Sequence, residues 1–90
     1  MNASGSFEIV NELGMHARAA AKLVQLASQY ECKVELEKDG QTADAKSVMG
    51  VLLLCGHRGS KINVSALGPD ADAAVNAIGA LIANRFGEDR

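Results

Sequence analysis

The hydrophobic positions of this chain recur with two different periods, and the change from one period to the other predicts seven elements. Segments in which every second residue is apolar indicate strands, because successive side chains of a strand point to opposite faces. Segments in which apolar residues recur every three or four positions indicate amphipathic helices. Strands are expected at 6–11, 32–38, 41–45 and 61–67, and helices at 17–29, 47–54 and 70–85.

The strand at 32–38 shows the clearest alternation, since charged residues occupy every second position. Asp39-Gly40 follows it as a tight hairpin turn, which predicts that 41–45 pairs back as a weaker strand. One face of each strand is expected to point into the core. In the three clearest strands, the inward residues are Phe7, Ile9, Cys32, Val34, Leu36, Ile62, Val64 and Ala66.

Each predicted helix has an apolar stripe, and two of them carry start or stop signals. Ser47 can cap the first turn of the helix at 47–54 through its side-chain oxygen. Asp70 and Asp72 suit the positive end of the last helix, and Gly87 follows that helix as a stop. The stripes consist of Ala20, Leu23, Val24 and Ala27, then Val51 and Leu54, and finally Ala71, Ala74, Val75, Ile78, Leu81 and Ile82.

The order of elements, β-α-β-β-α-β-α, predicts an α+β fold. Helices that gather on one face of an antiparallel sheet form a two-layer, open-faced sandwich. We therefore expect a four-stranded antiparallel sheet with three helices on one face and a charged face toward solvent. A chain of 90 residues is expected to form one domain over residues 1–90.

Composition narrows the function classes. The chain is 48% hydrophobic, has no Trp and has a net charge of −2, with its Lys and Arg scattered, so the core is aliphatic and nucleic-acid binding is not expected. No apolar run approaches the ~20 residues of a membrane span, and no signal peptide is evident, which favours the cytoplasm without membrane insertion. Cys32 and Cys55 form no CxxC pair and are expected to be buried free thiols.

The candidate chemistry centres on His16, which lies between a glycine-marked loop and an alanine-rich helix. Unpaired N–H groups at a helix start favour an anion, and a neutral imidazole is a nucleophile. Gly14 permits an unusual turn just before His16, and Arg18 can direct a guanidinium toward the same anion. A histidine that only caps the helix or fills the turn is the alternative interpretation.

Two further residues have simpler interpretations. Ser47 can be an ordinary helix cap, and that role holds whatever else it does. His57 lies in a loop between Gly56 and Gly59 without a comparable anion cradle, so we expect a solvated loop histidine.

Two segments carry a family resemblance. Residues 13–19 (LGMHARA) resemble the active-site signature of the HPr family, the histidine-containing phosphocarriers of the bacterial phosphotransferase system. Residues 45–51 (AKSVMGV) resemble that family's second signature, around a regulatory serine, and the two lie about thirty residues apart as in the family. The resemblance covers about residues 6–86, and the element order matches the HPr fold.

The resemblance implies a phosphocarrier rather than an enzyme. His16 would accept a phosphoryl group on Nδ1 from phosphorylated Enzyme I and donate it to an EIIA-type protein. Arg18 would stabilise the phosphate, together with the backbone N–H groups of Ala17 and Arg18. No metal or organic cofactor is implied, and a monomer is expected.

The resemblance also implies regulation at Ser47 by an HPr kinase/phosphorylase, with a transcriptional regulator as a further candidate partner. Added phosphate would repel an acidic partner.

The partner-binding side chains are expected among the apolar residues near Ser47, which are Met15, Val48, Met49, Leu52 and Leu53. Val48, Met49 and Leu52 are favoured as the exposed ones. Methionine adapts to several partners.

One departure from the family leaves the subtype open. Ala19 stands where many members have proline, as it does in a subset that includes nitrogen-related phosphocarriers, so both a sugar-uptake relay and a regulatory nitrogen relay remain. A small acylphosphatase-like enzyme is an alternative from a different class, and it would release phosphate instead of holding it. A soft-metal chaperone would need paired loop cysteines, which this sequence lacks.

Overall fold

The computed structural model describes residues 2–90, and it has the predicted β-α-β-β-α-β-α order followed by a short 3₁₀ turn. The four strands form one antiparallel sheet in the order β1-β4-β2-β3. The elements are β1 (Asn2–Glu8), α1 (Ala17–Ala27), β2 (Lys33–Lys38), β3 (Gln41–Asp44), α2 (Val48–Leu53), β4 (Lys61–Leu67), α3 (Ala71–Ala83) and the 3₁₀ turn η1 (Arg85–Gly87). The predicted α+β sandwich is confirmed.

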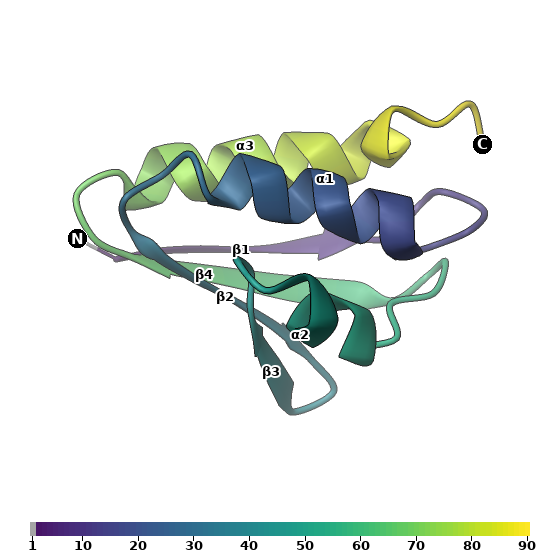
Figure 1. Cartoon of the computed structure of the whole chain (residues 1–90), viewed down its shortest axis with the longest axis horizontal. Coiled ribbons are helices and arrows are strands. Elements are labelled where there is room, and N and C mark those ends of the chain that lie inside the picture. The colour runs from purple at the N-terminus through teal and green to yellow at the C-terminus, as the bar shows by residue number, and fades with distance from the viewer. Residues whose placement is uncertain (1) are drawn as a thin grey trace.

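The helices lie over one face of the sheet in two groups (Figure 1). α1 and α3 run side by side, with α3 packed on β1 and β4. α2 contacts α1 and β3, near the other edge of the sheet. In β4 the inward positions alternate with exposed ones along the whole strand, so the opposite face of the sheet meets solvent as expected. None of the helices within residues 2–90 is long and apolar enough to cross a membrane.

The core is built from the inward residues of the strands and of the helical stripes, together with one aromatic ring that follows α3. All the predicted inward strand residues are buried except Phe7, which is half-buried and packs against the core from its edge. Val24 and Leu81 are likewise only half-buried, at the borders of their helical stripes. Phe86, in contrast, is fully buried. The core is therefore mainly aliphatic, with Phe86 as its largest fully buried side chain.

The first strand differs from the prediction of 6–11, because it runs from Asn2 to Glu8. Its first residues, 2–6, are all small or polar and show no alternation of large apolar side chains, which is why the pattern missed them. Ile9 leaves the sheet and pairs instead with the loop before β4. Its N–H donates to Ser60 O at 2.8 Å, and its carbonyl accepts from Gly59 N at 2.8 Å.

The last helix is shorter than the predicted 70–85, since it ends at Ala83. Arg85 and Phe86 then adopt left-handed backbone angles, with φ of 58° and 53°, and Gly87 follows with φ of 80°. This turn folds the Phe86 ring into the core. The first helix also stops earlier than residue 29, at Ala27.

Asp70 was expected to stabilise the start of the last helix through its charge, but it also forms hydrogen bonds to another segment. Its side chain makes no capping bond within α3, although it stands at the N-cap position. Its carboxylate accepts instead from the backbone N–H groups of Glu31 and Cys32, both at 2.9 Å. These bonds, that of Glu31 foremost, lower the pKa of Asp70 and tie the start of α3 to the start of β2.

The two cysteines differ from each other, against the expectation that both are buried. Cys32 is buried and free, as predicted. Cys55 is free but exposed, because it follows α2 in a left-handed turn with φ of 55°. Leu54 takes the inward position immediately before it.

Gly79 allows the Phe7 ring to lie directly against α3, since a Cβ at this position would overlap ring atoms. Replacing Gly79 with alanine should raise helix propensity by about 1 kcal/mol. The clash should outweigh that gain, because overpacking costs about 1–3 kcal/mol. We expect Gly79→Ala to lower the free energy of unfolding in urea, whereas Asn76→Ala, at an exposed position of the same helix, should not. A more stable Gly79→Ala variant would contradict this packing.

The bonds to Asp70 predict an acid-sensitive contribution to stability. A carboxyl whose pKa is lower in the folded state stabilises the fold above its unfolded pKa, and the contribution disappears as the pH falls through the folded pKa. Asp70→Asn should therefore lower the melting temperature at neutral pH and reduce the loss of stability below about pH 4. Asp72→Asn, in the first turn of the same helix, controls for the helix dipole. An Asp70→Asn acid profile identical to that of the wild type would contradict the assignment.

Candidate functional site

The turn before α1 is fixed by backbone contacts at Gly14. Gly14 has φ of 67°, and a Cβ there would lie 2.6 Å from the carbonyl oxygen of Gly56. The next residue, Met15, donates its N–H to that same oxygen at 2.6 Å. The turn therefore requires glycine for its conformation, as the sequence suggested, and also for lack of space. It delivers His16 to the N-cap position of α1.

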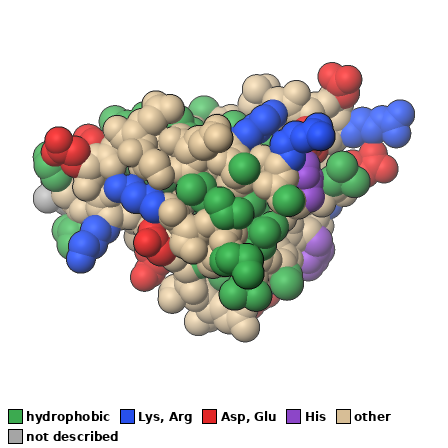
Figure 2. Space-filling model, viewed as in Figure 1, with side chains coloured by type: hydrophobic (Ala, Val, Ile, Leu, Met, Phe, Trp, Pro, Cys, Tyr) green, Lys and Arg blue, Asp and Glu red, His purple; other side chains and the backbone are tan. Residues whose placement is uncertain are grey.

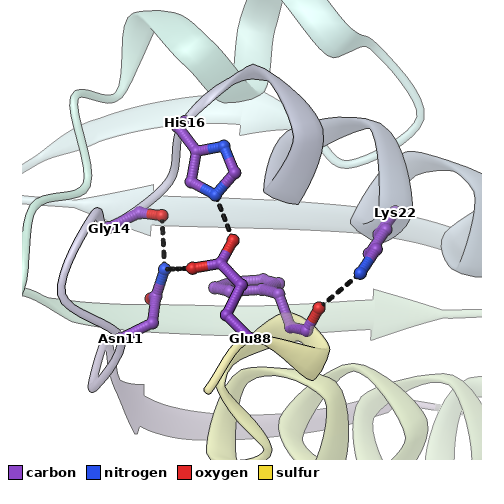
Figure 3. A network of polar contacts seen from close by, with 6 residues as sticks. Asn11, Gly14, His16, Lys22 and Glu88 are labelled. Carbon is purple, nitrogen blue, oxygen red and sulfur yellow. Dashed lines mark hydrogen bonds and ion pairs between the residues drawn. The ribbon is translucent and has the colours of Figure 1, made fainter. Parts of the chain in front are cut away.

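His16 is held by a partner that sequence reasoning missed. Its Nε2 is in hydrogen-bond contact with Oε2 of Glu88, a residue of the segment that follows α3 (Figure 3). The other carboxylate oxygen of Glu88 accepts from Asn11 Nδ2 at 2.9 Å. This bond is the main reason that the pKa of Glu88 is lowered. The only signal in the sequence was an acidic residue just after Gly87, with nothing to link it to residue 16.

The other ring nitrogen of His16, Nδ1, points away from Glu88 (Figure 3). The imidazole does not cap α1, and the first bond of the helix runs from Ala20 N to His16 O at 2.9 Å. The N–H groups of Ala17, Arg18 and Ala19 therefore have no acceptor within the helix. This arrangement favours a negatively charged group at the start of α1, beside the imidazole.

Arg18 is exposed and forms no hydrogen bond or salt bridge within residues 2–90. It lines a shallow depression of about 390 Å³ together with His16 and Glu88. The other lining residues are Glu12, Leu13, Asp89 and Arg90. The structure thus brings together the imidazole, the helix start and a guanidinium that has no partner in the described part of the chain.

Ser47 occupies the N-cap of α2, as predicted, and its Oγ accepts from Gly50 N at 3.1 Å. His57 is exposed in its loop, as expected for a solvated histidine. Within residues 2–90, no cluster of three His, Cys, Asp or Glu side chains is arranged to hold a metal ion.

Exposed apolar side chains lie on α2 and in the loop before α1, but they are not all the ones predicted. Met49 is 70% exposed and Leu53 72% exposed, four residues apart on the same face of α2. Leu13, before α1, is 71% exposed, and Val48 is also exposed. We call these four residues the apolar patch. Figure 2 shows hydrophobic side chains gathered over α2, with histidine and cationic side chains at their border.

Two predicted members of this surface are corrected. Met15 is buried, at 7% exposure, because its backbone bond to Gly56 turns the side chain into the core, where its Cβ lies against Gly56. Leu52 is half-buried, because Val51 and Leu54 define the inward face of α2 and Leu52 lies beside it. The outward face of α2 presents Met49, as predicted, together with Leu53.

Comparison with known proteins gives consistent results for family, sequence and structure. A family model described as the PTS HPr component phosphorylation site matches residues 3–84. The phosphocarrier protein HPr of Cupriavidus necator is 50% identical over 80 residues, which cover 89% of this chain and 90% of that protein. The phosphocarrier protein NPr of Shewanella violacea is 44% identical over 80 residues, covering 89% of this chain and 88% of that protein.

A crystal structure of HPr from Thermoanaerobacter tengcongensis superposes with a TM-score of 0.94 at 39% sequence identity. The match covers 98% of this chain and 99% of that one. Sequence family and three-dimensional structure therefore agree, and the chain belongs to the HPr family of phosphocarrier proteins of the phosphotransferase system.

Proposed function

We propose that His16 is the residue that carries the phosphoryl group, accepting it on Nδ1 from phosphorylated Enzyme I and donating it to an EIIA-type protein. One observation carries this proposal. Nδ1 faces away from Glu88, beside the uncapped first turn of α1 and on the surface that Arg18 shares. Nucleophile, anion site and cation therefore meet at an accessible position.

The transfer follows from this placement. With its proton on Nε2, the neutral imidazole has a lone pair on Nδ1. That lone pair attacks the phosphorus atom in line with the bond to the donor's histidine, and the electron pair of the broken P–N bond returns to the donor. Such transfers depend mainly on positioning and on charge stabilisation. Donation to the acceptor is the same displacement with Nδ1 of His16 as the leaving nitrogen.

Arg18 and the N–H groups of Ala17 and Arg18 stabilise the phosphoryl oxygens in this proposal. A guanidinium matches phosphate in geometry and charge, and Arg18 has no competing acceptor within residues 2–90. Ala17 is exposed at the first helical position, where its N–H is not used by the helix. No cofactor takes part in the proposed step.

The apolar patch is the proposed docking surface for the partners of the phosphotransferase system. Its side chains lie around α2 and in the loop that leads to His16, so a protein that covers them also reaches Nδ1. Exposed methionine and leucine side chains adapt to different partner surfaces at little cost. The same patch can therefore contact Enzyme I and an EIIA-type protein in turn.

Ser47 is the proposed regulatory site, modified by an HPr kinase/phosphorylase. It lies directly before Val48 and Met49, so a phosphate there adds about −1.5 to −2 charges at the edge of the docking surface. The start of α2 tolerates this charge, whereas an acidic partner is repelled by it. A transcriptional regulator that reads the modified surface is a further proposed partner.

A nitrogen-type relay is the second candidate for the pathway served. The NPr of Shewanella violacea is nearly as similar to this chain as the HPr of Cupriavidus necator. Ala19 is fully buried in the first turn of α1, where its N–H is not needed by the helix. Alanine therefore replaces the common proline without a change of architecture. Transfer rates from phosphorylated protein to sugar-type and nitrogen-type EIIA proteins distinguish the two relays.

Phosphorylation by Enzyme I and phosphoenolpyruvate, followed by intact-mass measurement, tests the carrier residue. The wild type and His57→Ala should each gain one acid-labile phosphoryl group, and His16→Ala should gain none. Arg18→Ala should accept the group about ten- to a hundredfold more slowly, since it loses a charge-assisted contact. A labile adduct that survives in His16→Ala would contradict the proposal.

Incubation with an HPr kinase and ATP tests Ser47. An acid-stable phosphate should form on the wild type and be absent in Ser47→Ala. Ser47→Asp should slow phosphoryl acceptance from Enzyme I, because it places a negative charge beside the apolar patch. Ser65→Asp adds the same charge at an exposed position of β4 on the opposite face and should have little effect. Unchanged acceptance by the Ser47-phosphorylated protein would contradict regulation by repulsion.

A further inference from the structure

The segment that follows α3, residues 84–90, is held beside His16 by contacts on both sides of Glu88. The Phe86 ring is buried in the core, and its carbonyl oxygen accepts from Lys22 Nζ of α1 at 2.7 Å. Beyond Glu88, the carbonyl oxygen of Arg90 accepts from the N–H of Glu12 at 3.0 Å. Glu88 therefore lies between two anchored positions. It also lies outside residues 3–84, which the family model matches.

The Glu88 carboxylate is oriented by a buried amide. Asn11 is fully buried, and its Nδ2 donates to Glu88 Oε1 at 2.9 Å and to Gly14 O at 2.8 Å (Figure 3). Rotating the amide by half a turn would place its oxygen against these two acceptors, so the donor orientation is fixed. One carboxylate oxygen is thereby held by Asn11, and the other faces His16 Nε2.

We propose that Glu88 is a positioning residue that keeps the proton of His16 on Nε2 and so leaves the lone pair on Nδ1. Asn11 acts one step further out, by holding the carboxylate. A carboxylate only accepts hydrogen bonds, so its contact with Nε2 selects the tautomer protonated at that nitrogen. The inference rests on the proposed function of His16. It assigns a role to a segment that lies outside both family signatures, residues 13–19 and 45–51.

The proposed contact also serves the phosphorylated state. When Nδ1 bonds to phosphorus, Nε2 keeps its proton and the ring acquires positive charge, which the Glu88 carboxylate compensates. When the P–Nδ1 bond breaks, the electron pair returns to Nδ1 and the proton stays where it was. A carboxylate behind a histidine acts in a comparable way in hydrolase triads, where it holds the tautomer and stabilises the charged ring. No proton has to leave the site in either direction.

The charge of Glu88 does not oppose the incoming phosphate directly. The carboxylate faces Nε2, whereas the phosphoryl group is proposed to bind Nδ1, on the other side of the ring. The hydrogen bond from Asn11 lowers the pKa of Glu88, so the group is ionised at neutral pH. The side chains of His16 and Glu88 are 26% and 19% exposed, so water screens their contact only in part.

The tautomer of the unphosphorylated protein is the direct test. Proton–nitrogen correlation spectra of the His16 ring, recorded at mildly alkaline pH, should show the proton on Nε2 in the wild type. Glu88→Ala should increase the fraction protonated on Nδ1 several-fold. Glu88→Gln should also raise this fraction, because the fixed Asn11 donor takes the single amide oxygen of the new side chain and leaves its NH₂ group facing Nε2. Asp72→Asn, which removes an exposed carboxylate in the first turn of α3 outside the site, is the matched control and should resemble the wild type.

Phosphoryl acceptance from Enzyme I provides the second measurement. Glu88→Ala should lower kcat about three- to tenfold with little change in KM, because positioning of the ring is lost and docking is not. An unchanged tautomer in Glu88→Ala would overturn the proposal, and so would a loss confined to KM. If the wild type accepted no phosphoryl group at all, the proposed function would fail, while the spectra would still decide whether Glu88 sets the tautomer.

Discussion

The hydrogen bonds of the buried Asn11 amide connect the two segments on which the site depends. One N–H fixes the turn that precedes His16, and the other holds the carboxylate of Glu88 from the far end of the sequence. A buried amide is costly unless it is hydrogen-bonded, so these two contacts are the condition for placing Asn11 in the interior. The side-chain oxygen Oδ1 of Asn11 has no partner within residues 2–90, so the two bonds donated by Nδ2 must offset the cost of burying it.

The regular part of the fold could be predicted because burial follows a simple period in β2 and β4. Both strands place apolar and polar residues alternately, and both are internal strands of the sheet, so each inward side chain is covered by helices. β1 is an edge strand, and its N-terminal half consists of small residues whose burial is decided by the register with β4. A pattern within one strand contains no information about a register between two strands.

In the candidate site, too, some residues could be predicted from local sequence signals and one could not. His16, Arg18 and Ser47 stand at helix starts, and local signals such as a glycine turn or a capping serine identify helix starts from sequence. Glu88 reaches His16 only because three consecutive left-handed residues turn the chain after α3. Two of these, Arg85 and Phe86, are not residues that favour such angles, so tertiary packing of the Phe86 ring must enforce them. That constraint is not local, and sequence periodicity could not show it.

The apolar patch shows how a small rotation of a short helix changes which residues a partner meets. α2 has only six residues, and Val51 is its one fully buried side chain. With so few contacts, the exposed direction is set by the turns at both ends of the helix and not by an extended stripe. Met49 consequently faces solvent as predicted, but it is joined there by Leu53 and not by Leu52. Met15 was misplaced for a related reason, since a backbone bond from a distant loop decides its direction.

An open site suits a protein that must release what it accepts. In the proposed relay the same phosphoryl group arrives and departs through similar displacements, so strong stabilisation of the phosphorylated state would slow the second transfer. An exposed arginine in a shallow depression stabilises an anion less than a buried one does, because solvent screens the pair. Within residues 2–90 the ring is instead hydrogen-bonded at Nε2, the side away from the proposed phosphate, by a carboxylate that Asn11 holds. The contacts that orient the imidazole are therefore different from those that bind the phosphoryl group. A partner that covers the apolar patch can complete the charge stabilisation during transfer.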